Sequence, residues 1–345
     1  MRPSAPTILR AALCACGLWG SWASEGVAQT LPSRPAPAAQ NPSPMVETTR
    51  AHERLAARPF DGFGRSFLGP ADRAVEVRIP AAARGRASVD VVVHFHGAAW
   101  IAEQAVAALG DGTVAVVLNL GSGSGVYHRP FVAAATFDSL LTSVSRELTA
   151  ALGTAPRIGR LTLSGWSAGH GAIRAILLEP RHMARVDAIL LLDGMHTSYV
   201  PDGRVLSDSG VIDTTNLVAL TAFARAAVRG EKRFLVTHTE IFPGTFASTT
   251  ETADWLLSAL GLRRRAVLEW GPRGSQQLSE VSAGGFTLLG FAGNTAPDHV
   301  DLLHGMPEFL VRLHAPSPAA SRPAVVPRSP RDPLPAPPHG QRLRR

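Results

Sequence analysis

The chain has 345 residues, of which 45% are hydrophobic and 18% are charged, so it can bury one sizeable core but is short for two full domains. This composition excludes a fibrous or wholly disordered protein. The formal net charge is +7, but residues 315–345 hold six Arg and one Asp, and residues 1–28 hold two Arg and one Glu. Because the residues between these ends are close to neutral, the charge does not indicate a nucleic-acid-binding groove.

Residues 1–28 have the layout of a secretory signal peptide. Arg2 and Arg10 precede or interrupt a short apolar run, and small residues lead to a cleavage position after Ala28. The run is too short to span a membrane, so we predict no transmembrane segment and an exported protein, periplasmic or extracellular. Cleavage would remove both cysteines, Cys14 and Cys16, which excludes disulfides and cysteine catalysis. The alternative interpretation is a lipid anchor on Cys16. Arg10 argues against it, because its charge interrupts the apolar run that such an anchor signal requires.

The segments next to the folded body are rich in proline. Residues 29–59 are predicted to be a linker, and residues 315–345 contain nine prolines, which is typical of a disordered tail. The predicted folded domain is therefore residues 60–314. The basic tail is expected to be solvated, and weak contact with anionic envelope polymers is the alternative.

Short β-branched runs alternate with stretches of helical spacing through residues 60–314. The predicted strands are 74–79, 89–95, 114–118, 160–163, 188–192, 233–237 and 286–291, and the predicted helices are 137–152, 168–178, 214–228, 249–260 and 298–313. Several strands are apolar at consecutive positions, which indicates that both their faces are covered. We therefore predict an α/β fold with a mostly parallel central sheet, helices on both faces, and a site at the carboxyl ends of the strands.

The pattern G-x-S-x-G lies between a predicted strand and a predicted helix, as Gly165-Trp166-Ser167-Ala168-Gly169. Small residues suit a turn so tight that the serine adopts a strained backbone and exposes its hydroxyl. The pattern alone is weak, since a Gly/Ser loop could merely pack a helix on the sheet. Its place between a strand and a helix favours Ser167 as a nucleophile.

At these residues the chain resembles the α/β-hydrolase superfamily, in which the acid and the histidine follow the serine along the chain. The resemblance covers about residues 75–313 by element order and a few short motifs, and it points to no single enzyme. It implies a serine hydrolase, most simply a carboxylesterase acting through an acyl-enzyme on Ser167. An amidase or peptidase with the same residues, and a non-catalytic envelope-binding protein with the same fold, are the alternatives.

An oxyanion hole requires fixed N–H donors aimed at the developing charge. The resemblance implies that Ala168 supplies one donor and that the loop after an earlier strand supplies the second. That loop begins with His94-Phe95-His96-Gly97, and Ala98 is the predicted donor, with Ala99 as the alternative.

The general base is expected after the last strand, where His299 and His304 are the candidates. Leu302 and Leu303 follow His299 at helical spacing, so His299 shares the face that packs on the body, whereas His304 points away from it. We therefore predict His299, with His304 as the alternative.

The acid is ambiguous from the sequence. Asp193 ends one predicted strand beside a glycine, which favours a sharp turn with an exposed carboxylate, and Glu240 ends the next strand. Asp193 is the prediction and Glu240 the alternative. Asp213 and Asp298 are each expected to be a helix N-cap instead.

No cofactor or metal is predicted, and a metal-dependent hydrolase is the alternative. His94 and His96 alternate along a strand and resemble metal ligands, with His238, Asp193 and His299 available as further ligands. A core histidine is the preferred interpretation of His94.

The cleft is predicted to lack a large lid, because few residues lie between Asp193 and the next strand. Residues 196–213 are expected to form one wall, and Trp100, Trp166 and Phe242 are candidate apolar contacts. The predicted partner is a small-molecule or extended ester rather than a long lipid, with no nucleic acid.

Overall fold

The computed structural model describes residues 53–315. The predicted leader (1–28), most of the linker (29–59) and nearly all of the tail (315–345) lie outside the described residues. Residues 53–61 contain neither helix nor strand. The body begins with strand β1 (Gly62–Leu68) and ends with helix α10 (Met306–His314).

Ten strands of residues 53–315 form one sheet in the order β1-β2-β4-β3-β5-β6-β9-β12-β11-β10. The strands from β4 to β12 in this order are parallel, and the pairs at both edges are antiparallel. Besides β1, they are β2 (Ala74–Pro80), β3 (Ser88–Phe95), β4 (Val114–Leu118), β5 (Arg157–Trp166), β6 (Ala188–Leu192), β9 (Arg233–His238), β10 (Arg265–Trp270), β11 (Gln276–Ala283) and β12 (Phe286–Phe291). The predicted mostly parallel sheet is confirmed.

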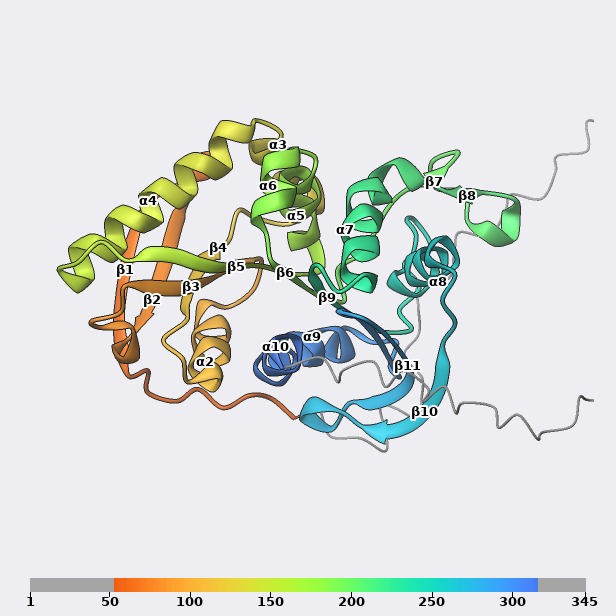
Figure 1. Ribbon diagram of the computed structural model, residues 1–345. Helices are drawn as coiled ribbons and strands as arrows, with labels where there is room; N and C mark the ends of the chain where they lie inside the picture. The colour runs from red at the N-terminus through yellow and green to blue at the C-terminus, as the bar shows by residue number, and fades with distance from the viewer. Residues whose placement is uncertain (1–52, 316–345) are drawn as a thin grey trace, which may run out of the picture. The chain divides into compact units, whose positions relative to one another are not determined.

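Helices cover both faces of this sheet (Figure 1). One face carries α3 (Ser124–Phe131), α4 (Ala134–Leu152), α5 (His170–Leu177), α6 (Pro180–Arg185), α7 (Val218–Val228) and α8 (Thr249–Leu260). The other carries α2 (Ala99–Leu109), α9 (Ala296–His304) and α10. A short second sheet, β7 (Tyr199–Val200) with β8 (Val211–Ile212), lies near α7.

Side-chain alternation divides the core into two clusters, one on each face of the sheet. Val91, Val93 and Phe95 of β3 belong to the cluster beneath α4, α5 and α7. Val92 belongs to the cluster beneath α2 and α10. All four are fully buried, which is why consecutive positions of this strand are apolar.

The central strands agree with the sequence prediction, whereas the edge strands and the helices α2, α3 and α6 are absent from it. Strands 114–118, 188–192 and 286–291 and helix 249–260 have the predicted bounds. The helix predicted over 298–313 is two helices, because α9 ends at His304 with Gly305 as its C-cap and Pro307 lies in the first turn of α10. The outer strands β1, β10 and β11 were not predicted, since their exposed, polar sequences lack an apolar period.

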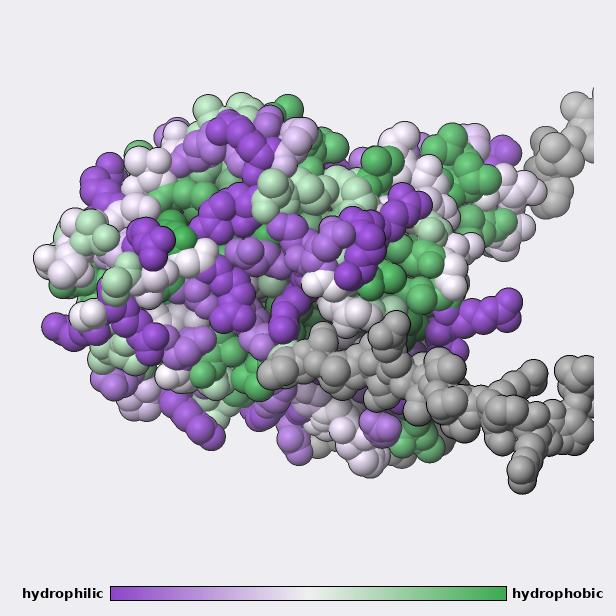
Figure 2. Space-filling model, in the orientation of Figure 1, coloured by the Kyte–Doolittle hydropathy of each residue, from purple (hydrophilic) through white to green (hydrophobic). Residues whose placement is uncertain are grey.

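Hydrophilic and hydrophobic residues interleave over the face shown in Figure 2. Hydrophobic groups are visible there over the region of α7, β7 and β8, where Val200, Leu206, Val211 and Val218 are exposed. No helix within residues 53–315 combines the length and apolarity that crossing a membrane requires.

Candidate active site

Ser167 lies in a tight turn between β5 and α5. Its φ is 48°, a left-handed backbone that is uncommon outside glycine. A Cβ at Gly165 would lie 3.0 Å from the carbonyl carbon of Gly169, and a Cβ at Gly169 would overlap the carbonyl oxygen of Phe95. The turn is pressed against β3 at Gly169, which requires glycine there, and it folds back tightly on itself at Gly165, which favours glycine, as the G-x-S-x-G pattern predicts.

His299 and Asp193 form a close pair, although 106 positions separate them in the sequence. Nδ1 of His299 lies 2.7 Å from Oδ2 of Asp193. A carboxylate oxygen accepts, so Nδ1–H donates. In the neutral ring this leaves Nε2 unprotonated, which is the tautomer that a general base needs.

Asp193 is buried rather than exposed, which corrects the expectation from its glycine neighbour. Its side chain accepts hydrogen bonds from the N–H of Thr239 (3.0 Å) and from the hydroxyls of Thr239 and Thr249 (2.6 Å each). Burial by itself would raise the pKa of Asp193, but the hydrogen bonds from His299, Thr239 and Thr249 together hold it well below its ordinary value. The residue is therefore a carboxylate at neutral pH.

Ser167 lies between two cavities at the carboxyl edge of the sheet. The first has a volume of about 510 Å³ and includes Ser167, Ala168, His170 and Arg174 in its lining. The second, of about 530 Å³, includes Ser167, Asp193 and His299. The structure therefore brings the predicted serine, histidine and acid to one cleft.

Trp166 helps to position His299. Its indole Nε1–H donates to the carbonyl oxygen of His299 at 3.0 Å, and the two rings pack at 4.7 Å between centroids. The same indole stacks on His96 at 5.1 Å. Trp166, one of the three candidate apolar contacts named from the sequence, thus contacts the site as well as the core.

The loop after β3 leaves one backbone donor uncommitted among three consecutive ones. The N–H of His96 donates to the carbonyl of Leu118 (3.0 Å), and the N–H of Gly97 donates to Oδ1 of Asn119 (3.0 Å). Nδ2 of Asn119 donates in return to the carbonyl of Gly97 (2.8 Å). Among residues 53–315 no such acceptor is present for the N–H of Ala98 or for that of Ala99, so both stay open as oxyanion donors.

His96 is fixed from behind by Tyr127. Nδ1 of His96 lies 2.8 Å from the Tyr127 hydroxyl, whose oxygen accepts from the N–H of Leu120 at 3.2 Å. Burial, and then the proximity of His299, lowers the pKa of His96. The ring is therefore held in place and neutral at the wall of the first cavity.

The alternative site residues lie apart from this pair. Glu240 is about half exposed, and its nearest basic contact is Nδ1 of His238 at 3.9 Å. Nδ1 of His304 accepts from the N–H of Leu55 (3.0 Å), and its ring packs on Trp100. Neither side chain lines the two cavities at Ser167.

The two other aspartates serve helix ends. Asp213 accepts from the N–H of Thr215 as an N-cap. Asp298 lies at the third position of α9 and forms a reciprocal capping box with Thr295. The expected N-cap is confirmed for Asp213 and is wrong for Asp298, because Thr295 is the N-cap of α9 and Asp298 is its partner in the capping box.

His94 lies in the core. Its Nδ1 is 3.0 Å from the hydroxyl of Ser164 and its ring is fully buried. His96 lies beyond the end of β3 with a φ of 69°, so the strand alternation assumed for a metal pair does not extend to it. Within residues 53–315 no three His, Cys, Asp or Glu side chains form a cluster suited to a metal ion.

Solved structures with similar folds include three esterases. The enterobactin esterase of Shigella flexneri is 13% identical, with 76% of this chain and 61% of that chain covered and a TM-score of 0.46. Esterase 2 of Thermogutta terrifontis is 19% identical (77% and 100% covered, TM-score 0.41). A cold-adapted esterase from an Arctic intertidal metagenomic library is 16% identical (74% and 95% covered, TM-score 0.39).

No protein-family model and no curated protein matches the chain. The sheet order, the parallel strands with helices on both faces, and the strained turn after β5 are features of the chain itself. By this architecture the chain has the α/β-hydrolase fold.

Buried histidines make the fold sensitive to acid. Burial, and then His96, lowers the pKa of His94 from 6.5 to about 3. Between these values the unfolded chain binds a proton that the folded chain excludes, so stability falls as the pH decreases. We expect the free energy of unfolding to fall about 1.4 kcal/mol per pH unit more steeply in the wild type than in His94→Asn between pH 6 and 4. Denaturant unfolding at each pH measures this, and equal slopes would contradict it.

Proposed function

We propose that the chain is a serine hydrolase that cleaves carboxylic esters through an acyl-enzyme on Ser167. The observation that carries the proposal is the 2.7 Å hydrogen bond between His299 and a buried Asp193, in a cavity that Ser167 also lines. A serine, an imidazole of fixed tautomer and a carboxylate are the groups that acyl transfer by this route requires.

In the proposed reaction the Ser167 hydroxyl attacks the ester carbonyl while Nε2 of His299 takes its proton. The N–H groups of Ala168 and Ala98 would donate to the oxyanion of the tetrahedral intermediate. The imidazolium then gives its proton to the departing alkoxide, which leaves as the alcohol. Water, deprotonated by the same imidazole, releases the carboxylic acid.

Asp193 would stabilise the imidazolium that forms in each step. Its depressed pKa keeps it ionised, and its two threonine partners fix its direction toward Nδ1 of His299. In this mechanism Asp193 is not itself protonated.

The nucleophile is tested with the purified protein and a fluorophosphonate probe. We expect the wild type to be labelled and to hydrolyse p-nitrophenyl acetate, and Ser167→Ala to lose labelling and about 10³-fold or more in kcat. Ser122→Ala is the matched control, since Ser122 lines the same cavity, and it should still be labelled. Labelling that persists in Ser167→Ala would rule out this nucleophile.

The acid is tested by two isosteric changes. Asp193→Asn keeps the size of the side chain but favours the wrong tautomer of His299, so kcat should fall about 10³- to 10⁴-fold. Glu240→Gln should stay within about threefold of the wild type, because Glu240 has no contact with His299. The reverse pattern in steady-state kinetics would transfer the acid role to Glu240.

Export is part of the proposal and rests on the signal-like residues 1–28. When the full chain is expressed in a bacterium, we expect the mature protein outside the cytoplasm with Gln29 as its first residue, as read by mass spectrometry. Recovery of the intact chain from the cytoplasm alone would contradict export. Incorporation of labelled palmitate that is lost in Cys16→Ala would instead support the lipid anchor.

A further inference from the structure

The two cavities at Ser167 differ in what they offer an ester. His196 and Phe246 line both cavities, and their rings meet edge to face at 5.1 Å. In the mechanism proposed above, His299 must protonate the leaving oxygen, and His299 lines only the second cavity. The first cavity, next to the Ala168 donor, is therefore left for the acyl part of the substrate.

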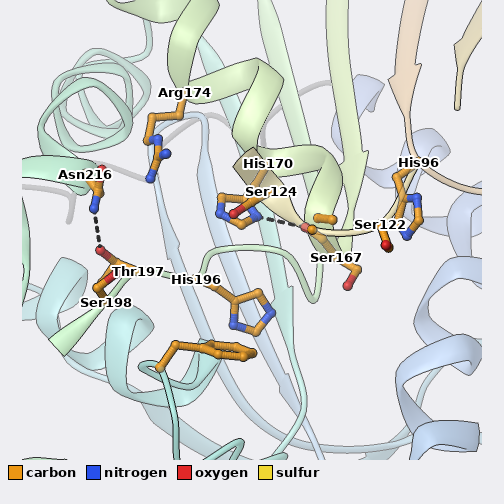
Figure 3. Close-up of a pocket in the computed structure, with 13 residues that line it drawn as sticks. His96, Ser122, Ser124, Ser167, His170, Arg174, His196, Thr197, Ser198 and Asn216 are labelled. Atoms are coloured by element: carbon orange, nitrogen blue, oxygen red, sulfur yellow. Dashed lines mark hydrogen bonds between the residues drawn. The ribbon is translucent and has the colours of Figure 1, made fainter. Parts of the chain in front are cut away.

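Arg174 places a positive charge in this first cavity. Arg174 lies two helical turns beyond Ser167, near the C-terminal end of α5, and its guanidinium points into the cavity at the end away from the serine (Figure 3). Its Nε is buried and has no hydrogen-bond partner within residues 53–315. Arg174 as a whole is half-buried, and an anion bound in the cavity would pair with its positive charge.

Within residues 53–315 no carboxylate forms an ion pair with Arg174. The cavity lining contains no Asp or Glu. Asp213 acts on Arg174 electrostatically, but it forms no ion pair with it among the described residues, and its two oxygens accept hydrogen bonds from Thr215 and Asn216.

The imidazoles in the cavity wall do not compete for an anion. Burial, and then the charge of His196, lowers the pKa of His170 to about 3, and burial also lowers the pKa of His196. Nδ1–H of His170 is engaged with the carbonyl oxygen of Ser167 at 2.8 Å. At neutral pH the cationic group of this lining is therefore Arg174, and Ser122, Ser124 and Ser198 add hydroxyl groups elsewhere in the cavity.

We infer that the acyl group of the substrate ends in a carboxylate that Arg174 binds, so that the enzyme cleaves monoesters of dicarboxylic acids. The planar guanidinium matches a carboxylate through two parallel N–H donors. Seven residues of helix separate Ser167 from Arg174, about 10 Å along the axis, and the arginine side chain points back into the cavity. An acyl chain that spans from the Ser167 ester to this guanidinium should be favoured over shorter and longer ones. This inference rests on the proposed function of Ser167.

The test compares two substrates of equal size. One is the p-nitrophenyl monoester of glutaric acid, and the other is the same ester with its free carboxylic acid replaced by a carboxamide. We expect the wild type to prefer the acid over the amide by about tenfold or more in kcat/KM, mostly through KM. Arg174→Gln should bring this ratio close to one, and Arg174→Lys should keep part of it. Arg146→Gln, which removes an exposed charge on α4, is the matched control and should keep the wild-type ratio. Succinic, adipic and suberic monoesters then locate the preferred length.

A wild-type ratio near or below one throughout this length series, or a ratio retained in Arg174→Gln, would overturn the inference. Failure of the proposed function is distinguishable, because the wild type would then hydrolyse none of the esters and would not be labelled by fluorophosphonate. Free glutarate gives a readout without turnover. It should raise the melting temperature of Ser167→Ala. The rise should be smaller in the double variant that combines Ser167→Ala with Arg174→Lys. Equal shifts in these two proteins would count against Arg174, including where Arg174→Gln fails to fold.

Discussion

The close approach of the β5–α5 turn to strand β3 is the constraint on which the site depends. Gly169 is packed against the carbonyl of Phe95, and Gly171 against the backbone of Ser124. No side chain fits at these two contacts, so the turn lies directly beside the loop that carries Ala98. The strained backbone of Ser167 is maintained by this packing. The same contact brings the proposed nucleophile and the proposed oxyanion donors into one corner of the fold.

A second requirement is the stabilisation of a buried charge. Asp193 loses its contact with water, and an ionised carboxylate in that position is tolerated only because three hydroxyl or amide hydrogen bonds and His299 satisfy it. Thr239 follows β9 and Thr249 begins α8, so three separate elements converge on one side chain. Trp166 holds the main chain of His299 from the opposite side of the turn. The proposed catalytic pair is thus rigid before any substrate arrives, as electrostatic catalysis requires.

The two cavities beside Ser167 differ in the groups that line them, which bears on substrate selectivity. Both begin at Ser167, but one contains the proposed proton donor and the other contains the guanidinium group of Arg174, whose Nε has no hydrogen-bond partner within residues 53–315. Such a division lets the leaving group and the acyl group be recognised independently. The neutral histidines between them maintain the shape of the wall without adding charge.

The central strands, five of the helical stretches and the position of the serine turn can be predicted from the sequence alone, because apolar period and glycine placement are local properties. Helices α2, α3 and α6 are not among these predictions. It left Asp193 and Glu240 both open, and it assigned Asp193 an exposed carboxylate. Only the tertiary structure places Thr239, Thr249 and His299 around Asp193, pairs Asn119 with Gly97, and leaves Arg174 facing a cavity. These relations join residues that are far apart along the chain, and they depend on strand order and burial. No local pattern encodes them, so they follow only when the strands are in register and the helices are packed.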